Sequence, residues 1–107
     1  KQYTVNFNNQ SNTTNSSFSL QSLIENGAFL VDVRTPGEFA EGHISSSVNI
    51  PLDILPAHLS DFKNKSNIIV FCRSGGRSAM AKSILEQNGF TNVVNGGAWD
   101  YVRQFVK

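Results

Sequence analysis

The chain has few of the residues that bind metals or form covalent cross-links: one cysteine, Cys72, and two histidines, His43 and His58, in 107 residues. A single cysteine excludes an internal disulfide. Because these three side chains lie far apart in the sequence, no metal-ligand spacing is present. At this length we expect one domain with a single core, which requires neither a metal ion nor another cofactor.

The chain also lacks a large excess of positive or negative charge, and it has no long apolar run. Nine Lys and Arg residues against eight Asp and Glu give a formal net charge of +1, which argues against nonspecific binding to nucleic acid or to an anionic membrane. No apolar run approaches the ~20 residues of a membrane-spanning helix, and no signal peptide is visible. A lone thiol suits a reducing compartment, so we expect the cytoplasm, or the periplasm if a signal peptide has been removed.

The start of the chain differs in composition from the rest. Apolar and polar residues alternate from Tyr3 to Phe7, a period that predicts a short edge strand. Residues 8–17 are almost all Asn, Gln, Ser and Thr, which is typical of a flexible loop or linker. We therefore separate this N-terminal strand and polar loop, residues 1–17, from a domain formed by residues 18–107.

Strand and helix patterns alternate through this domain. Apolar runs predict strands at residues 28–33, 48–50, 68–71 and 93–94. Helical spacing predicts five helices. The first is capped by Ser19, the second covers 36–41 after a capping box, and the third lies around 55–62. The fourth extends from Ser78 to Asn88, and the last begins at Trp99 and includes Val102, Phe105 and Val106. Glycines punctuate these patterns, with helix stops at Gly27, Gly42 and Gly89 and a turn at Gly96 and Gly97.

Short connections between alternating strands and helices are typical of an α/β fold. Its mostly parallel central sheet would be flanked by helices on both faces. In such sheets the ligand site lies beyond the carboxyl ends of the strands. Arg34 and Cys72 each follow a predicted strand end, so both should lie at the same edge of the sheet.

The most informative stretch is the short loop after the central predicted strand. It contains Cys72, Arg73, Ser74, Gly75, Gly76 and Arg77, and Ser78 begins the next helix. Such a loop must curl with its backbone N–H groups inward, and two adjacent glycines allow the left-handed torsions that curling needs. Cys72 would then lie in a cup of amides at a helix N-terminus, which with nearby arginines lowers a thiol pKa below its usual ~8.5. The alternative is a buried structural cysteine, but the flanking arginines and glycines favour a reactive thiol.

This loop, CRSGGRS, resembles the active-site loop of the rhodanese family of sulfurtransferases. Four further segments resemble rhodanese landmarks in the family's order: LVDVR at 30–34, EFAEGHI at 38–44, VNIP at 48–51 and NGGAWDY at 95–101. The likeness extends from about Phe18 to Phe105. It implies the compact α/β rhodanese fold and a rhodanese-type enzyme, a thiosulfate:cyanide sulfurtransferase.

The resemblance also implies a mechanism. Cys72 would be the catalytic nucleophile and would carry the transferred sulfur as a persulfide. Sulfane sulfur would come from a small donor such as thiosulfate and pass to cyanide in vitro, or to a thiol or a sulfur-accepting protein in the cell. The substrate-binding residues would be those of the loop and one arginine beside it: Arg73, Ser74, Gly75, Gly76, Arg77, Ser78 and Arg34.

Other polar or aromatic residues favour structural roles. A strand-end Asp32 near arginines is more often part of an ion pair than a catalytic acid, and Arg34 is better placed to shape the rim of the pocket. The resemblance implies a structural role for the segment that contains His43, and we expect His58 to be a surface residue. Trp99 should anchor the last helix to the core.

Two other functions remain open. One is a cysteine-dependent phosphatase or arsenate reductase on the same fold; in cysteine phosphatases the loop is one residue longer than the four residues between Cys72 and Arg77. The other is a sulfur-carrying or sensing module that docks to a partner and turns over no small substrate.

Overall fold

The computed structural model describes residues 16–107, so the predicted strand near Tyr3 and most of the polar segment after it lie outside the described residues. The elements in chain order are α1 (Ser16–Glu25), β1 (Phe29–Asp32), α2 (Pro36–Glu41), β2 (Val48–Asn49), the 3-10 helix η2 (Leu55–Phe62), β3 (Ile68–Cys72), α3 (Gly76–Gln87), β4 (Val93–Ala98) and α4 (Trp99–Arg103). The first helix begins at Ser16 and not after a cap at Ser19. Serine costs a helix only a fraction of a kcal/mol, about 0.5, so its presence does not mark the helix start.

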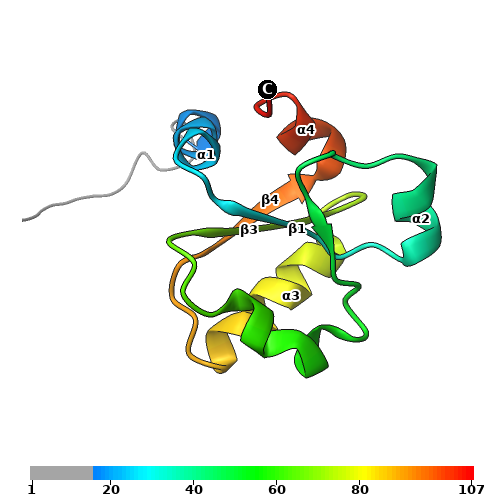
Figure 1. Cartoon of the computed structure of the whole chain (residues 1–107), viewed down its shortest axis with the longest axis vertical. Helices are drawn as coiled ribbons and strands as arrows, with labels where there is room; N and C mark the ends of the chain where they lie inside the picture. The colour runs from blue at the N-terminus through cyan, green and yellow to red at the C-terminus, as the bar shows by residue number, and fades with distance from the viewer. Residues whose placement is uncertain (1–15) are drawn as a thin grey trace, which may run out of the picture.

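Four strands form one parallel sheet in the order β2-β1-β3-β4. Helices α1 and α4 cover one face of this sheet, and α3 and η2 cover the other (Figure 1). The predicted α/β architecture, with a parallel sheet flanked on both faces, is therefore confirmed. Among the helices of residues 16–107, none is both long and apolar enough to cross a membrane.

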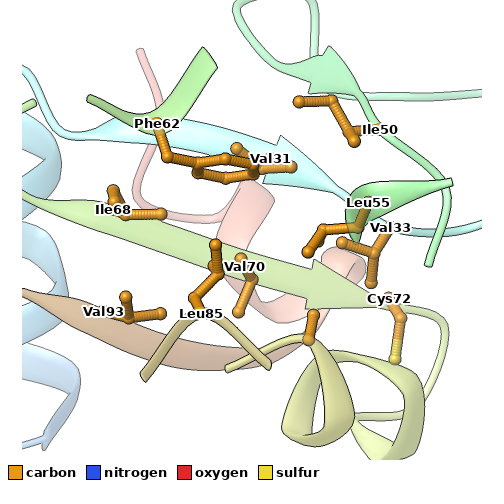
Figure 2. Packing of buried hydrophobic residues seen from close by; sticks show 11 residues of the cluster. Val31, Val33, Ile50, Leu55, Phe62, Ile68, Val70, Cys72, Leu85 and Val93 are labelled. Carbon is orange, nitrogen blue, oxygen red and sulfur yellow. The ribbon is translucent and has the colours of Figure 1, made fainter. Parts of the chain in front are cut away.

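Strand β3 lies at the centre of the core. All five of its residues are buried. Ile68, Val70 and Cys72 belong to the apolar cluster under η2 and α3 (Figure 2), whereas Ile69 and Phe71 belong to the cluster under α1 and α4. A strand covered on both faces has to be apolar at every position, which explains the unbroken apolar run and places Cys72 at the carboxyl edge of the sheet.

Glycine ends three helices as predicted: Gly42 follows α2, where its amide donates to the Phe39 carbonyl, and two left-handed glycines end α1 and α3. After α1, the Gly27 amide donates to the Ile24 carbonyl and the Ala28 amide donates to the Leu23 carbonyl. Gly27 has a φ of +87°, and Gly89, which ends α3 in the same way, has a φ of +94°. Only glycine adopts this left-handed backbone without a steric cost.

The predicted turn at Gly96 and Gly97 is wrong. Both glycines continue β4, which has a bulge at this point: Asn95 pairs with Val70, Gly97 pairs with Phe71, and Gly96 is the extra residue between them. An extra residue of this kind disrupts a ladder locally without ending the strand, so the two glycines mark an irregular strand and no chain reversal.

Three helices differ from the prediction in extent or type. Helix α4 ends at Arg103, although the residues after it still pack on the apolar cluster that Val102 joins. Helix η2 is kinked at His58. Helix α3 begins two residues before the predicted Ser78, and its Met80 side chain is 59% exposed. Its buried face consists of Ser78, Ala81 and Leu85.

Candidate active site

Cys72 is the last residue of β3 and is 1% exposed. The loop after it is shorter than predicted, because only Arg73, Ser74 and Gly75 separate β3 from α3, which begins at Gly76. Gly75 has a left-handed φ of +105°, but Gly76 does not have a positive φ. One glycine therefore makes the turn, and the other opens the helix.

Hydrogen-bond donors from the loop and the helix converge on the sulfur of Cys72. The Gly75 amide donates to Sγ at 3.0 Å and the Ser78 amide at 3.4 Å, and the Ser78 hydroxyl oxygen lies 3.5 Å from Sγ. Burial raises the pKa of the Cys72 thiol, but hydrogen bonds from the Ser78 hydroxyl and from the amides of Ser78, Gly75 and Ser74 outweigh it, so the pKa lies below its ordinary value. The predicted cup of amides is present, and it favours a thiolate.

Arg77 is paired with a carboxylate from another helix. Its Nη1 and Nη2 donate to Oε1 and Oε2 of Glu38 at 2.8 and 3.0 Å. Glu38 also completes the predicted capping box of α2, in which it accepts from the Thr35 amide and the Thr35 hydroxyl accepts from the Glu38 amide. The hydrogen bond from Arg77, with the Thr35 amide next, lowers the pKa of Glu38 to about 2. The guanidinium that was predicted to bind substrate thus links α3 to α2.

A buried ion pair fixes the carboxyl end of β1. Nη2 of Arg34 lies 2.7 Å from Oδ2 of Asp32, and the two side chains are 5% and 0% exposed. Arg34 also donates to the Gly42 carbonyl at 2.7 Å and lies 4.5 Å from the centre of the Trp99 ring. Asn49 donates from Nδ2 to the backbone carbonyls of Asp32 and Arg34. Asp32 therefore has the structural role expected of it, and the charge of Arg34 is already balanced.

A cavity of about 360 Å³ opens beside these groups. It is lined by Arg34, Glu38, Glu41, Gly42, Arg73 and Trp99. Within residues 16–107, the guanidinium of Arg73 has no hydrogen-bond or ion-pair partner. Of the predicted binding residues, Arg34 and Arg73 are the two that line the cavity, and Arg73 is the one with a free charge.

The two histidines lie in structural contacts. Nδ1 of His43 lies 2.8 Å from the Phe39 carbonyl oxygen, and the two rings stack with centres 3.8 Å apart. His58 is paired with Asp61 on the surface. In the part of the chain that the structure describes, no three His, Cys, Asp or Glu side chains are grouped as metal ligands.

Sequence reasoning missed three polar residues that position the site: Glu38, Asn49 and Asn95. Asn95 accepts from the Ser78 hydroxyl at 2.7 Å, across 17 residues of sequence. Glu38 meets Arg77 across 39 residues. In the sequence, Glu38 is marked only as part of a capping box and the two asparagines only as polar residues of short strands, and such signals are too common to predict these contacts.

Both the sequence and the fold resemble those of known sulfurtransferases. The family model described as a rhodanese-like domain matches residues 18–101. A sulfurtransferase of Allochromatium vinosum is 39% identical over 74 residues, which are 65% of this chain and 69% of the relative. The chloroplastic thiosulfate sulfurtransferase 16 of Arabidopsis thaliana is 40% identical over 93 residues, 72% of this chain and 78% of the relative. A human single-domain sulfurtransferase has a TM-score of 0.63 and 28% identity, over 78% of this chain and 88% of the human protein. The chain therefore belongs to the rhodanese-like domain family.

Proposed function

We propose that this protein is a sulfurtransferase that carries sulfur as a persulfide on Cys72. The named sulfurtransferases among its relatives support the reaction class. The observation that carries the proposal is the convergence of two amide donors on a single buried sulfur, with the Ser78 hydroxyl oxygen 3.5 Å from it. A structural cysteine needs no such donors, whereas a thiolate nucleophile does.

The reaction has two displacement steps. The Cys72 thiolate attacks the outer sulfur of a donor such as thiosulfate; a new S–S bond forms, the old S–S bond breaks, and sulfite leaves with the bonding electron pair. An acceptor nucleophile then attacks the outer sulfur of the persulfide and releases the Cys72 thiolate. With cyanide the product is thiocyanate. Since the sequence has no second cysteine, the acceptor has to be a separate molecule.

Arg73 is the residue that we expect to bind the anionic end of the donor. Its guanidinium lines the cavity and has no partner among residues 16–107, and guanidinium groups bind oxyanions in a two-pronged geometry. The sulfur itself is almost fully covered, since Cys72 is 1% exposed. A donor would therefore present one sulfur atom to Cys72 while its charged remainder stays in the cavity.

The phosphatase alternative is less favoured by the contacts around the site. The arginine that would hold a phosphate, Arg77, already uses both terminal nitrogens on Glu38. The acidic residue considered as a general acid from the sequence, Asp32, accepts hydrogen bonds at both oxygens from Arg34. A phosphatase would need an arginine whose charge is not already balanced to bind phosphate, and an acid available to protonate the leaving group.

Mass spectrometry combined with a turnover assay tests the proposal. After incubation with thiosulfate, we expect one added sulfur atom on Cys72, its loss on addition of cyanide, and formation of thiocyanate. Cys72→Ser should abolish all three, because only sulfur can carry a persulfide. Hydrolysis of an aryl phosphate without any added sulfur would establish the phosphatase instead. A persulfide that no small acceptor removes would establish a sulfur-carrying module.

A further inference from the structure

Asn95 connects strand β4 to the loop that surrounds the sulfur. Its Oδ1 accepts from the Ser78 hydroxyl at 2.7 Å and from the Gly97 amide at 2.9 Å. Its Nδ2 lies 3.5 Å from the Gly75 carbonyl oxygen. The Gly97 amide can only donate, so it determines which end of the Asn95 side chain is the oxygen. The Ser78 hydroxyl therefore meets an acceptor at Asn95, and it acts there as the donor.

The hydroxyl of Ser78 has several possible hydrogen-bond acceptors around it. It carries one proton, and three atoms compete for it: Oδ1 of Asn95 at 2.7 Å, the Gly75 carbonyl oxygen at 3.1 Å and Sγ of Cys72 at 3.5 Å. While Cys72 is a thiol, its S–H can donate to the Ser78 oxygen, and the Ser78 proton can stay on Asn95. Once the thiol proton has passed to solvent, the sulfur becomes an acceptor for that same Ser78 proton.

We propose that Asn95 is a positioning residue that controls the direction of the Ser78 hydroxyl. It holds the hydroxyl proton away from a protonated Cys72 and yields it to the sulfur when the thiolate forms. This inference rests on the proposed role of Cys72 as the nucleophile. Its consequence is a restraint on thiol acidity, because the thiolate gains the Ser78 hydrogen bond only at the expense of the bond to Asn95.

A limit on the acidity of the Cys72 thiol favours its reactivity. The nucleophilicity of a thiolate falls as its pKa falls, so the best attacking thiol has a pKa close to the ambient pH. Against the effect of burial, hydrogen bonds from the Ser78 hydroxyl and from the loop amides lower the pKa of Cys72, and the Ser78 hydroxyl would lower it further if it were not shared with Asn95. By competing for that proton, Asn95 keeps the sulfur reactive.

The proposed effect of Asn95 on the thiol pKa requires no change in the charge of any neighbouring side chain. The charged side chains around the site come from several elements: Arg77 of α3, Glu38 and Glu41 of α2, Asp32 and Arg34 at the end of β1, and Arg73 of the loop. Within residues 16–107 none of them is hydrogen-bonded to Asn95 or Ser78, so we expect them to stay in place when either residue is replaced by alanine. A shift in the thiol pKa of such a variant therefore reports on the hydroxyl.

The ultraviolet absorbance of the thiolate, followed against pH, tests the proposal. With a single cysteine in the chain, the signal belongs to Cys72 once the titration of Cys72→Ser has been subtracted. We expect Ser78→Ala to raise the thiol pKa by about one unit and Asn95→Ala to lower it by about half a unit. In the double variant, Asn95→Ala should add no shift to that of Ser78→Ala, because there is no hydroxyl left to direct.

A matched control comes from Asn92, which donates to the carbonyls of Lys65 and Ser66 at 2.6 and 2.9 Å, before β4 begins. Asn92→Ala removes a similar amide link at the opposite end of the sheet and should leave the thiol pKa unchanged. A second variant, Asn95→Asp, keeps the acceptor oxygen and adds a negative charge near the sulfur, and both effects should raise the pKa, the reverse of Asn95→Ala.

Three results would overturn the proposal: a raised thiol pKa in Asn95→Ala, an unchanged one, or a shift that persists without Ser78. Each would make Asn95 a purely structural link between β4 and the loop. The titration is done on the resting protein without a sulfur donor. A failure to form a persulfide would therefore overturn the proposed function and leave the result for Asn95 standing.

Discussion

Arg73 and Arg77 have the same side chain and flank the same sulfur, but their surroundings differ. Arg73 lines the cavity and has no partner within the described residues, whereas both terminal nitrogens of Arg77 are bound to Glu38. The resemblance implied substrate binding for both. Local spacing could predict the amide cup around Cys72, because its donors lie within six residues of the sulfur. It could not predict which arginine is free, because that depends on a distant carboxylate.

We therefore expect the two arginines to respond differently to substitution. Arg73→Ala should raise KM for thiosulfate about tenfold with little change in kcat, because it removes a charge-assisted contact to the donor. Arg77→Ala should mainly lower the free energy of unfolding, by about 1 kcal/mol, because it breaks an ion pair that is only partly buried. Steady-state kinetics and denaturant titration measure the two effects. Arg73→Lys, which keeps the charge but loses the planar fork, should fall between wild type and alanine; equal KM values for all three would refute the role of Arg73.

At the scale of elements, the ion pair between Glu38 and Arg77 joins two helices that the sequence gave no reason to connect. Each helix was predicted from local signals: the capping box of α2 from Thr35 and Glu38, and the body of α3 from its apolar spacing. The start of α3 was wrong by two residues, because a glycine that turns a loop and one that opens a helix look alike in a sequence. Only the fold shows that Gly75 does the first and Gly76 the second.

The link between the helices should depend on pH. The pKa of Glu38 is about 2 in the folded protein, whereas an unperturbed glutamate has a pKa of about 4.3. A folded-state pKa below the unfolded value contributes stability above about pH 4.3, which is lost as the pH falls toward about 2. Glu38→Gln should therefore lower the free energy of unfolding by about 1 kcal/mol at neutral pH and make no difference near pH 2. Denaturant titrations across this range measure the change.

Glu41→Gln provides the control for this experiment. Glu41 lies on the same helix and lines the same cavity, but within residues 16–107 it has no ion-pair partner. Its substitution should leave the free energy of unfolding unchanged at every pH. A constant difference between Glu38→Gln and wild type down to pH 2 would mean that the carboxylate is not the source of the stability.

Strand β4 and helix α4 meet at a glycine that tolerates no side chain. A Cβ at Gly96 would lie 2.8 Å from Cγ2 of Val102 and 3.0 Å from Cγ2 of Ile69, and both of those residues are fully buried. Gly96→Ala should therefore lower the free energy of unfolding by about 1–3 kcal/mol, as overpacking does in other cores. Gly37→Ala is the control, because the space around that position in α2 is open. A shift of the thermal midpoint in Gly37→Ala but not in Gly96→Ala would contradict the packing argument.

At the scale of the whole molecule, the sequence was sufficient for the architecture and insufficient for the details that adjust the site. Buried strands alternating with helices determine a parallel sheet, and a parallel sheet brings the residues after β1 and β3 to one edge. The bulge in β4 at Gly96 was not predictable, because a double glycine is equally typical of a turn. The contacts of Asn95 depend on the pairing of β4 with β3, which forms only in the complete fold.

The depth of Cys72 also determines which proteins could exchange sulfur with this one. An S–S bond between two proteins requires their Cα atoms to approach within about 7 Å, and Cys72 is 1% exposed at the end of a buried strand. Two copies of this chain cannot meet that requirement while folded, so oxidation by diamide should yield no covalent dimer on a non-reducing gel; dimers formed without denaturant would contradict this. A protein acceptor faces a related barrier, because its thiol has to reach the outer sulfur of the persulfide, which lies only about 2 Å beyond Sγ of Cys72. It would have to offer its cysteine on a protruding loop tip or chain end, because a thiol on a flat surface would stop short of the sulfur.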